Sequence, residues 1–521
     1  MSQDTSLEAR RQFLRTMVIT GSAALVPACR REERPPPENA DLSAAPKPPS
    51  LPDGIDPEFF VQHSKSPLAL EVRRSAIGAG VITPVSRFFV RNNLPMPSES
   101  IVAHADSWVL EIEGTRRPDS MSLAQLKGLG LETEGSVIQC SGNGRAFFDH
   151  APSGSEWGTG AAGCALWTGV RVKTLLEHLG GVAAGMKFFT STGGETLPEG
   201  MDRDELVVER SIPIDKALKD ALLAWEMNGA PIPLTHGGPL RLIVPGYYGC
   251  NNIKYVKRIA CTESESQAKI HQTGYRYRPI GKPGGPEYPS MWRMPVKSWV
   301  NGPGADDQPT LAGEVTFYGV ALSGERGVRR VEVSLDSGKT WSRATLEGPD
   351  LGPNAWRVFS YTTALPAGAH TIVSRATDTR GDTQPRERDE NERGYGHNGW
   401  LDAALTVNLV DVLPDQAPIV AQKQGDAGQS EPRKEVVLSE GGEAGKEVFA
   451  QAAQPPCGVC HTLSEAGTEG VVGPNLDDLK PDAQTVEAAV TTGVGAMPAY
   501  GTTLTPTQIK DIAAYVVEST K

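Results

Sequence analysis

The alternation of hydrophobic and polar positions divides the chain into regions of different predicted structure. Residues 137–140 form a β-type run, and residues 241–244 (RLIV) form a short apolar run that predicts a buried strand. Residues 84–97 predict a short apolar strand bounded by prolines. From Pro295 onward, short alternating strands such as 331–335 recur at regular spacing with turn signals between them. This spacing is typical of an immunoglobulin-like sandwich. At the end of the chain, residues 506–519 predict an amphipathic helix.

Other segments have no hydrophobic period. Residues 29–54 are rich in Pro, Ala and charge, and residues 413–437 carry Gln, Pro, Gly and Glu, so both are predicted to be flexible. At 521 residues the chain is too long for one hydrophobic core, and about three domains are expected. We therefore predict a disordered tether at 29–54 and a flexible linker at 413–437, with folded domains at 55–285, 286–412 and 438–521.

Composition narrows the class of protein. With 39% hydrophobic and 22% charged residues, the chain is predicted to be soluble and globular. Its net charge of −12 argues against nucleic acid or anionic lipid as a partner, because both favour basic surfaces. Seven cysteines are too few for a disulfide scaffold. A single disulfide between Cys250 and Cys261 is left open.

The N-terminus has the layout of an export signal. Arg10-Arg11-Gln12-Phe13-Leu14 precedes an uncharged run, 16–28, which is too short to span a bilayer. The twin arginines resemble the signal that exports folded proteins, so residues 1–28 are predicted to be a twin-arginine signal and the protein to be periplasmic. Cleavage after Ala28 gives a soluble product, and lipidation of Cys29 gives a lipid-anchored one.

The segment 137–148 (VIQCSGNGRAFF) contains the first candidate chemistry. A strand ends at Cys140 and the glycine-rich turn 141–144 follows, so the thiol is presented at a strand end. Arg145 brings a positive charge close to the sulfur. That charge favours a thiolate and can also hold an oxyanion.

The C-terminal region contains a second motif. Cys457 and Cys460 are spaced to bond the two vinyl groups of one haem, and His461 follows directly as an iron ligand. Gly473-Pro474-Asn475-Leu476 and then Met497 come in the order of a class I cytochrome c, which the region resembles. The resemblance implies an all-α domain with one covalent haem c and with Met497 as the sixth iron ligand.

The Cys140 loop, V-x-Q-C-x-G-N-x-R, resembles the molybdenum-binding loop of the sulfite oxidase family. In that family the cysteine is the one protein ligand of a molybdenum held by a pyranopterin dithiolene, and a soft thiolate suits such a metal. Residues 89–95 (FVRNNLP) match the family's F-V-R-N-x-L-P segment, whose arginine, here Arg91, contacts cofactor and substrate. Animal members have His where this chain has Asn93. The resemblance covers residues 55–412 and implies an α+β molybdopterin domain followed by an all-β dimerisation domain.

The same resemblance implies the remaining site residues. Trp157 is expected to line the substrate pocket. Residues 222–229 (LLAWEMNG) match a helix-end segment of the family, in which Trp225 occupies a position where the family usually has Tyr. Arg393 is expected to return to the site from the β-rich domain. The predicted catalytic residues are Arg91, Arg145, Trp157, Trp225 and Arg393; the predicted molybdopterin-binding residues are Phe89, Val90, Arg91, Asn92, Asn93, His236, Arg241, Asn252, Ile253 and Lys254.

The function implied is oxidation of sulfite to sulfate at a mononuclear molybdenum centre. Electrons would pass through the haem to an external acceptor, expected to be a c-type cytochrome, and a homodimer is compatible with a dimerisation domain. Three alternatives stay open. They are a dehydrogenase for another sulfur compound such as sulfane sulfur or thiosulfate, a reductase for a sulfoxide or nitrate, and a tethered electron carrier with an inactive molybdenum domain.

Overall fold

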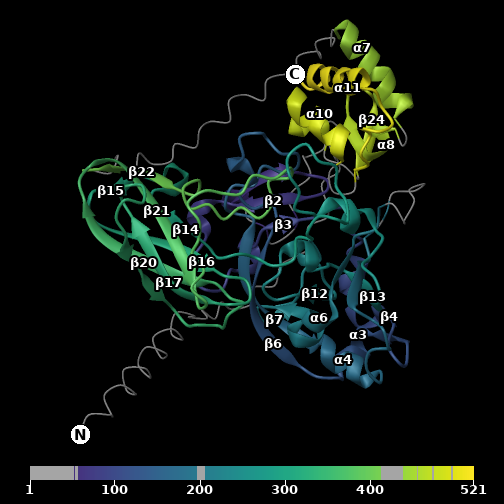
Figure 1. The fold of residues 1–521 in the computed structure, drawn as a ribbon, viewed down its shortest axis with the longest axis horizontal. Coiled ribbons are helices and arrows are strands. Elements are labelled where there is room, and N and C mark those ends of the chain that lie inside the picture. The colour runs from purple at the N-terminus through teal and green to yellow at the C-terminus, as the bar shows by residue number, and fades with distance from the viewer. Residues whose placement is uncertain are drawn as a thin grey trace, which may run out of the picture. The chain divides into compact units, whose positions relative to one another are not determined.

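The computed structural model describes Pro52, Ile55, residues 57–411 and residues 438–521, apart from 196, 198–205, 454–455, 472–474 and 494–496. The predicted signal at 1–28, with Cys29 after it, and the predicted linker at 413–437 therefore lie outside the described residues. In chain order the described residues form a mixed α and β part, a β-rich part and a helical part (Figure 1). Within these residues no helix is both long enough and apolar enough to cross a membrane.

The mixed part contains three sheets among its described residues. Their strand orders are β1-β2-β3, β11-β10-β7-β6 with β12 also paired to β10, and β5-β4-β13-β8-β9. Strands β4 and β13 are parallel, whereas the other pairs are antiparallel. The strand bounds are β1 Phe60–Ser64, β2 Ala69–Val72, β3 Val90–Arg91, β4 Val109–Glu113, β5 Asp119–Ser122, β6 Glu132–Gln139, β7 Ala162–Arg171, β8 Phe188–Gly193, β9 Glu209–Pro213, β10 Leu222–Met227, β11 Ala230–Pro231, β12 Arg241–Ile243 and β13 Val256–Thr262.

Short helices connect these strands. Helix α3 begins with a capping box, in which the Ser122 hydroxyl accepts from the Gln125 N–H and the Gln125 side chain accepts from the Ser122 N–H. The helices are α2 Ser100–Ala103, α3 Leu123–Lys127, α4 Val172–His178 and α6 Ile214–Asp220. The single turns are η1 Pro57–Phe59, η2 Arg74–Ala76, η3 Val85–Arg87, η4 Ala105–Ser107, η5 Arg145–Phe147, η6 Leu234–His236, η7 Gly249–Asn251 and the π-helical turn η8 Ile270–Gly274.

Two predicted elements of the mixed part differ from the structure. Residues 222–229, expected at a helix end, contain strand β10, which pairs with β7 and β12. Nearly every residue of β10 is buried, so the run has no alternation, and an apolar run of this kind does not distinguish a strand from a buried helix. The strand expected within 84–97 is reduced to the two-residue β3 after turn η3, in a segment bounded by prolines.

The β-rich part consists of two sheets around one core. The strand orders are β14-β16-β20-β19 and β15-β22-β21-β17-β18. Val300 and Phe317 from the first sheet and Val331 and Ile372 from the second are fully buried in the same cluster, which confirms a β-rich domain. The immunoglobulin-like topology stays a prediction. The bounds are β14 Lys297–Gly302, η9 Ala305–Asp307, β15 Thr310–Leu311, β16 Gly313–Leu322, β17 Val328–Ser334, β18 Ser342–Arg343, β19 Thr345–Glu347, β20 Arg357–Leu365, β21 Gly368–Asp378 and β22 Leu405–Val410.

The helical part has its own core. Phe449, Ile512 and Tyr515 are buried in it, and the last helix has the predicted bounds, with Pro506 in its first turn. A short hairpin, β23–β24, is an addition to the predicted all-α structure. The bounds are α7 Glu440–Glu447, the π-helical turn η10 Val448–Ala452, α8 Cys457–Cys460, β23 His461–Leu463, β24 Thr468–Val471, α9 Leu476–Leu479, α10 Ala483–Thr492 and α11 Pro506–Ser519.

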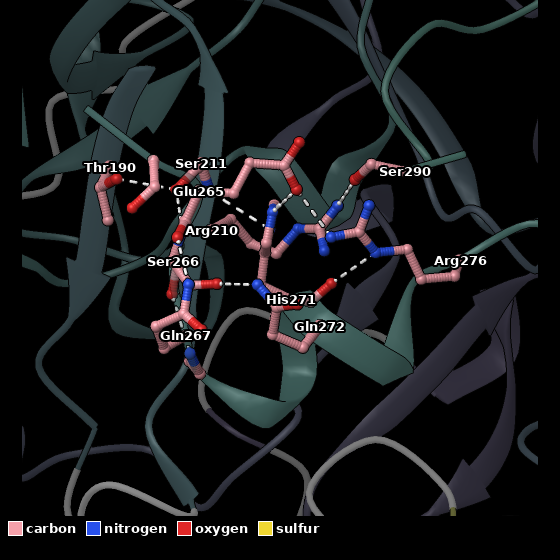
Figure 2. A network of polar contacts seen from close by, with 12 residues as sticks. Thr190, Arg210, Ser211, Glu265, Ser266, Gln267, His271, Gln272, Arg276 and Ser290 are labelled. Atoms are coloured by element: carbon pink, nitrogen blue, oxygen red, sulfur yellow. Dashed lines mark hydrogen bonds and ion pairs between the residues drawn. The ribbon is translucent and has the colours of Figure 1, made fainter. Parts of the chain in front are cut away.

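A buried polar network joins β9 to turn η8 (Figure 2). His271 Nε2 and Arg276 Nη2 both lie 2.7 Å from Glu265 Oε2, and the Ser211 N–H donates to His271 Nδ1 at 3.4 Å. Burial, together with the charges of Arg210 and Arg276, lowers the pKa of His271 to about 2. The imidazole is therefore neutral, accepting at Nδ1 and donating from Nε2 to the carboxylate.

This network predicts acid sensitivity. In the unfolded chain His271 takes up a proton below about pH 6.5, whereas in the folded chain it stays neutral down to about pH 2. The unfolded state thus binds more protons in this window, so His271 lowers the free energy of unfolding as pH falls, by at most about 1.4 kcal/mol per pH unit.

Urea unfolding at about pH 5 and about pH 7.5 measures the effect. His271→Gln keeps a donor toward Glu265 but cannot titrate, so it should show a smaller difference between the two pH values. An unchanged difference would contradict the assignment.

Candidate active site

The Cys140 loop has the geometry that the sequence predicts. Strand β6 ends at Gln139, and the Cys140 N–H donates to the Ala161 carbonyl at 2.9 Å. The Asn143 amide joins both sides of the loop, donating to Gln139 Oε1 at 3.2 Å and accepting from the Ala161 N–H at 3.0 Å. The Gln and Asn of the motif are therefore structural braces, and they fix where the thiol emerges.

Gly144 allows the loop to turn into η5. Its φ is 103°, in the left-handed region, and a Cβ at this position would lie 2.5 Å from His397 Cγ. Any other residue would meet both backbone strain and a steric clash. Arg145 begins η5, and its guanidinium packs against Gly142. A Cβ at Gly142 would lie 2.5 Å from Arg145 Nη2.

One cavity gathers most of the predicted cofactor residues around Cys140. Val90 and His236 are exceptions, since both are buried in its surroundings without lining it: Val90 pairs with Leu70 in the first sheet, and His236 Nε2 lies 3.3 Å from the Val85 carbonyl. The lining residues that the sequence predicted are Phe89, Arg91, Asn92, Asn93, Cys140, Arg241, Asn252, Ile253 and Lys254; those it missed are Phe88, Ile138, Ser141, Glu195, Val208, Gly249, Cys250 and Tyr275.

Positive charge is concentrated on one wall of this cavity. The buried Arg241 donates from Nη1 to the His236 carbonyl at 2.7 Å, and its Nε has no partner among the described residues. Lys254 donates to Asn92 Oδ1 at 2.7 Å and to the Thr235 carbonyl at 2.6 Å. Burial, with Arg241 nearby, lowers the pKa of Lys254 well below its usual range. A buried cluster of this kind is costly unless an anion joins it, so it suits a phosphate.

Of the three predicted arginines, Arg91 lines the cavity, whereas Arg145 and Arg393 contact each other and are not among its lining residues. The buried Arg145 donates from Nε to the Arg393 carbonyl at 2.9 Å and from Nη1 to the Ser155 carbonyl at 2.8 Å. The Tyr395 ring contacts both Arg145 and Arg393, with guanidinium carbons 5.3 and 5.7 Å from its centroid. Burial lowers the pKa of Arg145, and the neighbouring Arg393 and Arg91 act in the same direction. The β-rich part therefore brings Arg393 against Arg145, and a role of Arg393 in catalysis stays a prediction.

The two predicted tryptophans do not line the cavity. Trp157 is fully buried, with its ring 4.7 Å from that of His63. Trp225 lies on β10 within the core, where β10 pairs with β7 and β12, so it does not replace a pocket tyrosine.

The pocket phenol belongs to Tyr275, which follows turn η8 and donates to Asn93 Oδ1 at 3.0 Å. Burial raises the pKa of Tyr275 far above its usual value, so the phenol is protonated and donates.

Cys250 and Cys261 do not form a disulfide with each other. Cys250 lines the cavity and Cys261 lies on β13, and both are free thiols, so the disulfide that the sequence left open is not formed. Burial raises the pKa of each thiol to about 11. They are therefore neutral at physiological pH.

The haem motif lies in the helical part. Cys457 and Cys460 begin and end the single-turn helix α8, and His461 starts β23 directly after it. Cys457 and His461 are buried, and Met497 packs against the same core. Cys457 of the motif and the predicted sixth ligand, Met497, therefore pack in one small core.

Comparison with known proteins agrees with this arrangement. Three family models match in chain order: "Oxidoreductase molybdopterin binding domain" at residues 94–270, "Mo-co oxidoreductase dimerisation domain" at 288–408, and "Cytochrome C oxidase, cbb3-type, subunit III" at 441–516. Sulfite oxidase of Gallus gallus is 33% identical over 365 residues, which cover 65% of this chain and 77% of that protein. The chain belongs to the sulfite oxidase family.

Within the sulfite oxidase family, the mitochondrial sulfite oxidase of Homo sapiens is 32% identical over 359 residues, 65% of this chain. The chain spans 64% of the length of that relative. Among solved structures, the sulfane dehydrogenase SoxCD from Paracoccus pantotrophus superposes with a TM-score of 0.58 at 23% identity, covering 71% of this chain and 95% of the other. That likeness shows a shared fold.

Molybdenum-molybdopterin and haem c are the cofactors of this architecture. The site fits the first of them in two ways. Cys140 supplies a sulfur ligand at the cavity wall, and Arg241 and Lys254 supply donors for a phosphate, with the Arg241 Nε still unpaired among the described residues.

The cationic wall predicts how the cofactor is retained. Lys254→Met should lower molybdenum content and leave haem content unchanged, because it removes one charge-assisted contact, worth about 1.5–3 kcal/mol. Metal analysis and the haem absorbance of the same sample measure both quantities. Lys257→Met is the matched control, since Lys257 lies over the Trp108 ring and not in the cavity. Equal molybdenum content in both variants would refute the role of Lys254.

Proposed function

We propose that this protein oxidises sulfite to sulfate. One sulfite and one water give one sulfate, two protons and two electrons, and the electrons leave one at a time through the c haem to an external acceptor, a c-type cytochrome. The observation that carries this proposal is that Cys140, Arg91 and Tyr275 line one cavity. Arg241 and Lys254, whose donors suit a phosphate, line the same cavity. The molybdenum centre, when bound, would supply oxygen transfer and accept the two electrons.

The chain's own residues would bind and orient the anion. Arg91 lines the cavity and can form charge-assisted hydrogen bonds to an oxyanion. Arg145 and Arg393 add buried positive charge, which acts strongly because water is excluded. Tyr275 can turn its single O–H, which here donates to Asn93 Oδ1, toward the anion and donate to it from the protonated phenol. Cys140 would hold the metal as a thiolate, in contrast to the neutral Cys250 beside it.

The alternatives are separated by direct measurements. A dehydrogenase for sulfane sulfur or thiosulfate would show a higher kcat/KM for that compound than for sulfite. Asn93 keeps this alternative open, whereas Trp225 no longer supports it because it lies outside the cavity. A reductase for nitrate or a sulfoxide would oxidise the reduced haem when given that substrate. A tethered electron carrier would contain haem but no molybdenum.

Location and assembly are also part of the proposal. The twin-arginine segment supports export of the folded, cofactor-loaded protein to the periplasm, either free or anchored through Cys29. The match to a dimerisation domain supports a homodimer. Charge supports the choice of acceptor, because a chain with net charge −12 associates best with a basic or neutral cytochrome.

The first test is haem reduction by the substrate. Sulfite added to the oxidised protein should reduce the haem, as measured by its absorbance, and Cys140→Ser should abolish this reduction because a hydroxyl is a poor ligand for a soft metal. Cys164→Ser, at a buried cysteine on β7 outside the cavity, is the matched control and should retain it. Haem reduction by Cys140→Ser at the rate of the unchanged protein would refute the ligand assignment.

The second test asks which aromatic residue, Tyr275 or Trp225, contributes to sulfite oxidation. Tyr275→Phe should lower kcat/KM for sulfite by about 2- to 12-fold, the effect of one neutral hydrogen bond of about 0.5–1.5 kcal/mol. Trp225→Phe should leave this value nearly unchanged, since Trp225 does not line the cavity. Steady-state kinetics at equal molybdenum content decides between them. A larger loss in Trp225→Phe would mean that the pocket is built around β10.

A further inference from the structure

Arg210 is a buried cation behind the cavity wall. It lies on β9, and only 1% of its surface is exposed. Nη2 donates to Ser290 Oγ at 2.7 Å (Figure 2). Nη2 also donates to Asn251 Oδ1 at 3.3 Å, and Nη1 donates to the Ile270 carbonyl at 3.4 Å. These acceptors are all neutral, and Arg210 Nε has no partner among the described residues. The charge of Arg210 is therefore solvated by the protein without being neutralised by a hydrogen-bonded carboxylate.

The nearby carboxylate is already engaged. Glu265 Oε2 contacts both His271 and Arg276 at 2.7 Å. Arg276 also donates from Nε to the His271 carbonyl at 2.9 Å, which ties the two residues together. Two arginines thus lie in one buried network with different roles: Arg276 forms the ion pair, and Arg210 is left with neutral partners.

The aromatic ring beside Arg210 is that of Tyr275. The guanidinium carbon lies 5.5 Å from the ring centroid, within the range of a cation–π contact. The same ring stacks on Tyr395 with centroids 5.5 Å apart, and its hydroxyl donates to Asn93 at 3.0 Å. Tyr395 in turn contacts Arg145. Buried cations and aromatic rings are therefore in contact in the order Arg210, Tyr275, Tyr395 and Arg145.

Arg210 also fixes the loop that carries another cavity residue. Its partner Asn251 belongs to η7 and donates to the Tyr248 and Met291 carbonyls at 3.1 and 2.8 Å. The neighbouring Cys250 lines the cavity. A change at Arg210 would thus reach the cavity through the Tyr275 ring and through η7.

We infer that Arg210 is a positioning residue for Tyr275: it holds the ring so that the phenol faces an oxyanion in the cavity. The inference deepens the proposed function and rests on it for the identity of the anion. It assigns a role to a residue that touches neither the substrate nor the cofactor cavity.

The test is a double-mutant cycle in the full-length, cofactor-loaded protein. Arg210→Gln should lower kcat/KM for sulfite by about 2- to 12-fold, no more than Tyr275→Phe does, because both changes act through the same hydroxyl. Arg210→Lys should restore part of the loss because it keeps a cation at the ring. In a Tyr275→Phe background, Arg210→Gln should change kcat/KM by less than about 2-fold, since no hydroxyl remains to be positioned. Equal losses in both backgrounds would overturn the inference.

Two further variants separate positioning from stability. Arg74→Gln is the matched control, because Arg74 donates to the Val300, Ala403 and Ala404 carbonyls away from the cavity. Its effect on kcat/KM should be the same with and without the Tyr275 hydroxyl, even if Arg74→Gln lowers the melting temperature. An effect that depends on Tyr275 would overturn the inference. Ser290→Ala is a milder probe if Arg210→Gln does not fold. It removes the acceptor at 2.7 Å and should shift kcat/KM in the same direction, again only when Tyr275 is present.

A binding measurement keeps this inference distinct from the proposed function. Sulfate titrated into the oxidised protein by calorimetry should bind several-fold more weakly to Arg210→Gln, and this loss should vanish in the Tyr275→Phe background. If the unchanged protein does not oxidise sulfite, the proposed function fails, while the sulfate cycle still tests Arg210. Equal weakening in both backgrounds, or no sulfate binding to the unchanged protein, would overturn the role of Arg210.

Discussion

Burial of positive charge around one cavity is the constraint on which the site depends. Arg145, Arg210, Arg241 and Lys254 are buried or nearly so, and a buried cation is costly unless its donors are satisfied. Here the main partners are neutral oxygens: the carbonyls of His236, Thr235, Arg393 and Ser155, with the side chains of Asn92 and Ser290. Such dipoles stabilise each charge without neutralising it, although Glu195, a carboxylate that lines the cavity, favours the charged form of Lys254. The cavity is therefore preorganised for anions, for both a cofactor phosphate and an oxyanion substrate.

That arrangement needs a backbone that cannot relax. The Cys140 loop is held by three contacts: Asn143 with Ala161, the residue before β7; Gly144 with His397; and Lys297 of β14 with the Asn143 carbonyl. Lys297 Nζ donates to the Asn143 carbonyl at 3.0 Å, and burial lowers the pKa of this lysine to about 7. The β-rich part thus contributes directly to the loop that presents the thiol. The mixed part and the β-rich part therefore build this site together, through Lys297 and Arg393.

Local sequence could predict the features that local forces determine. The turn after Cys140, the haem motif at Cys457 and the capped helix at 506–519 depend on neighbouring residues, and each is present. Tyr275 could not be found in this way, because its hydroxyl meets Asn93 across 182 positions of sequence. The prediction that Trp225 lies in the pocket failed for another reason. Nearly all of β10 is buried, and an apolar run does not show which face of a buried strand meets the cavity.

Charge is distributed in opposite senses inside and outside this protein. The chain carries a net charge of −12, yet the cavity gathers cations. Charges on the surface are screened over about 8 Å at physiological ionic strength, whereas buried charges are screened far less. The anion site can therefore attract a small oxyanion despite the acidic surface. Association with a basic cytochrome instead depends on exposed charge, so salt should weaken that encounter more than it weakens anion binding.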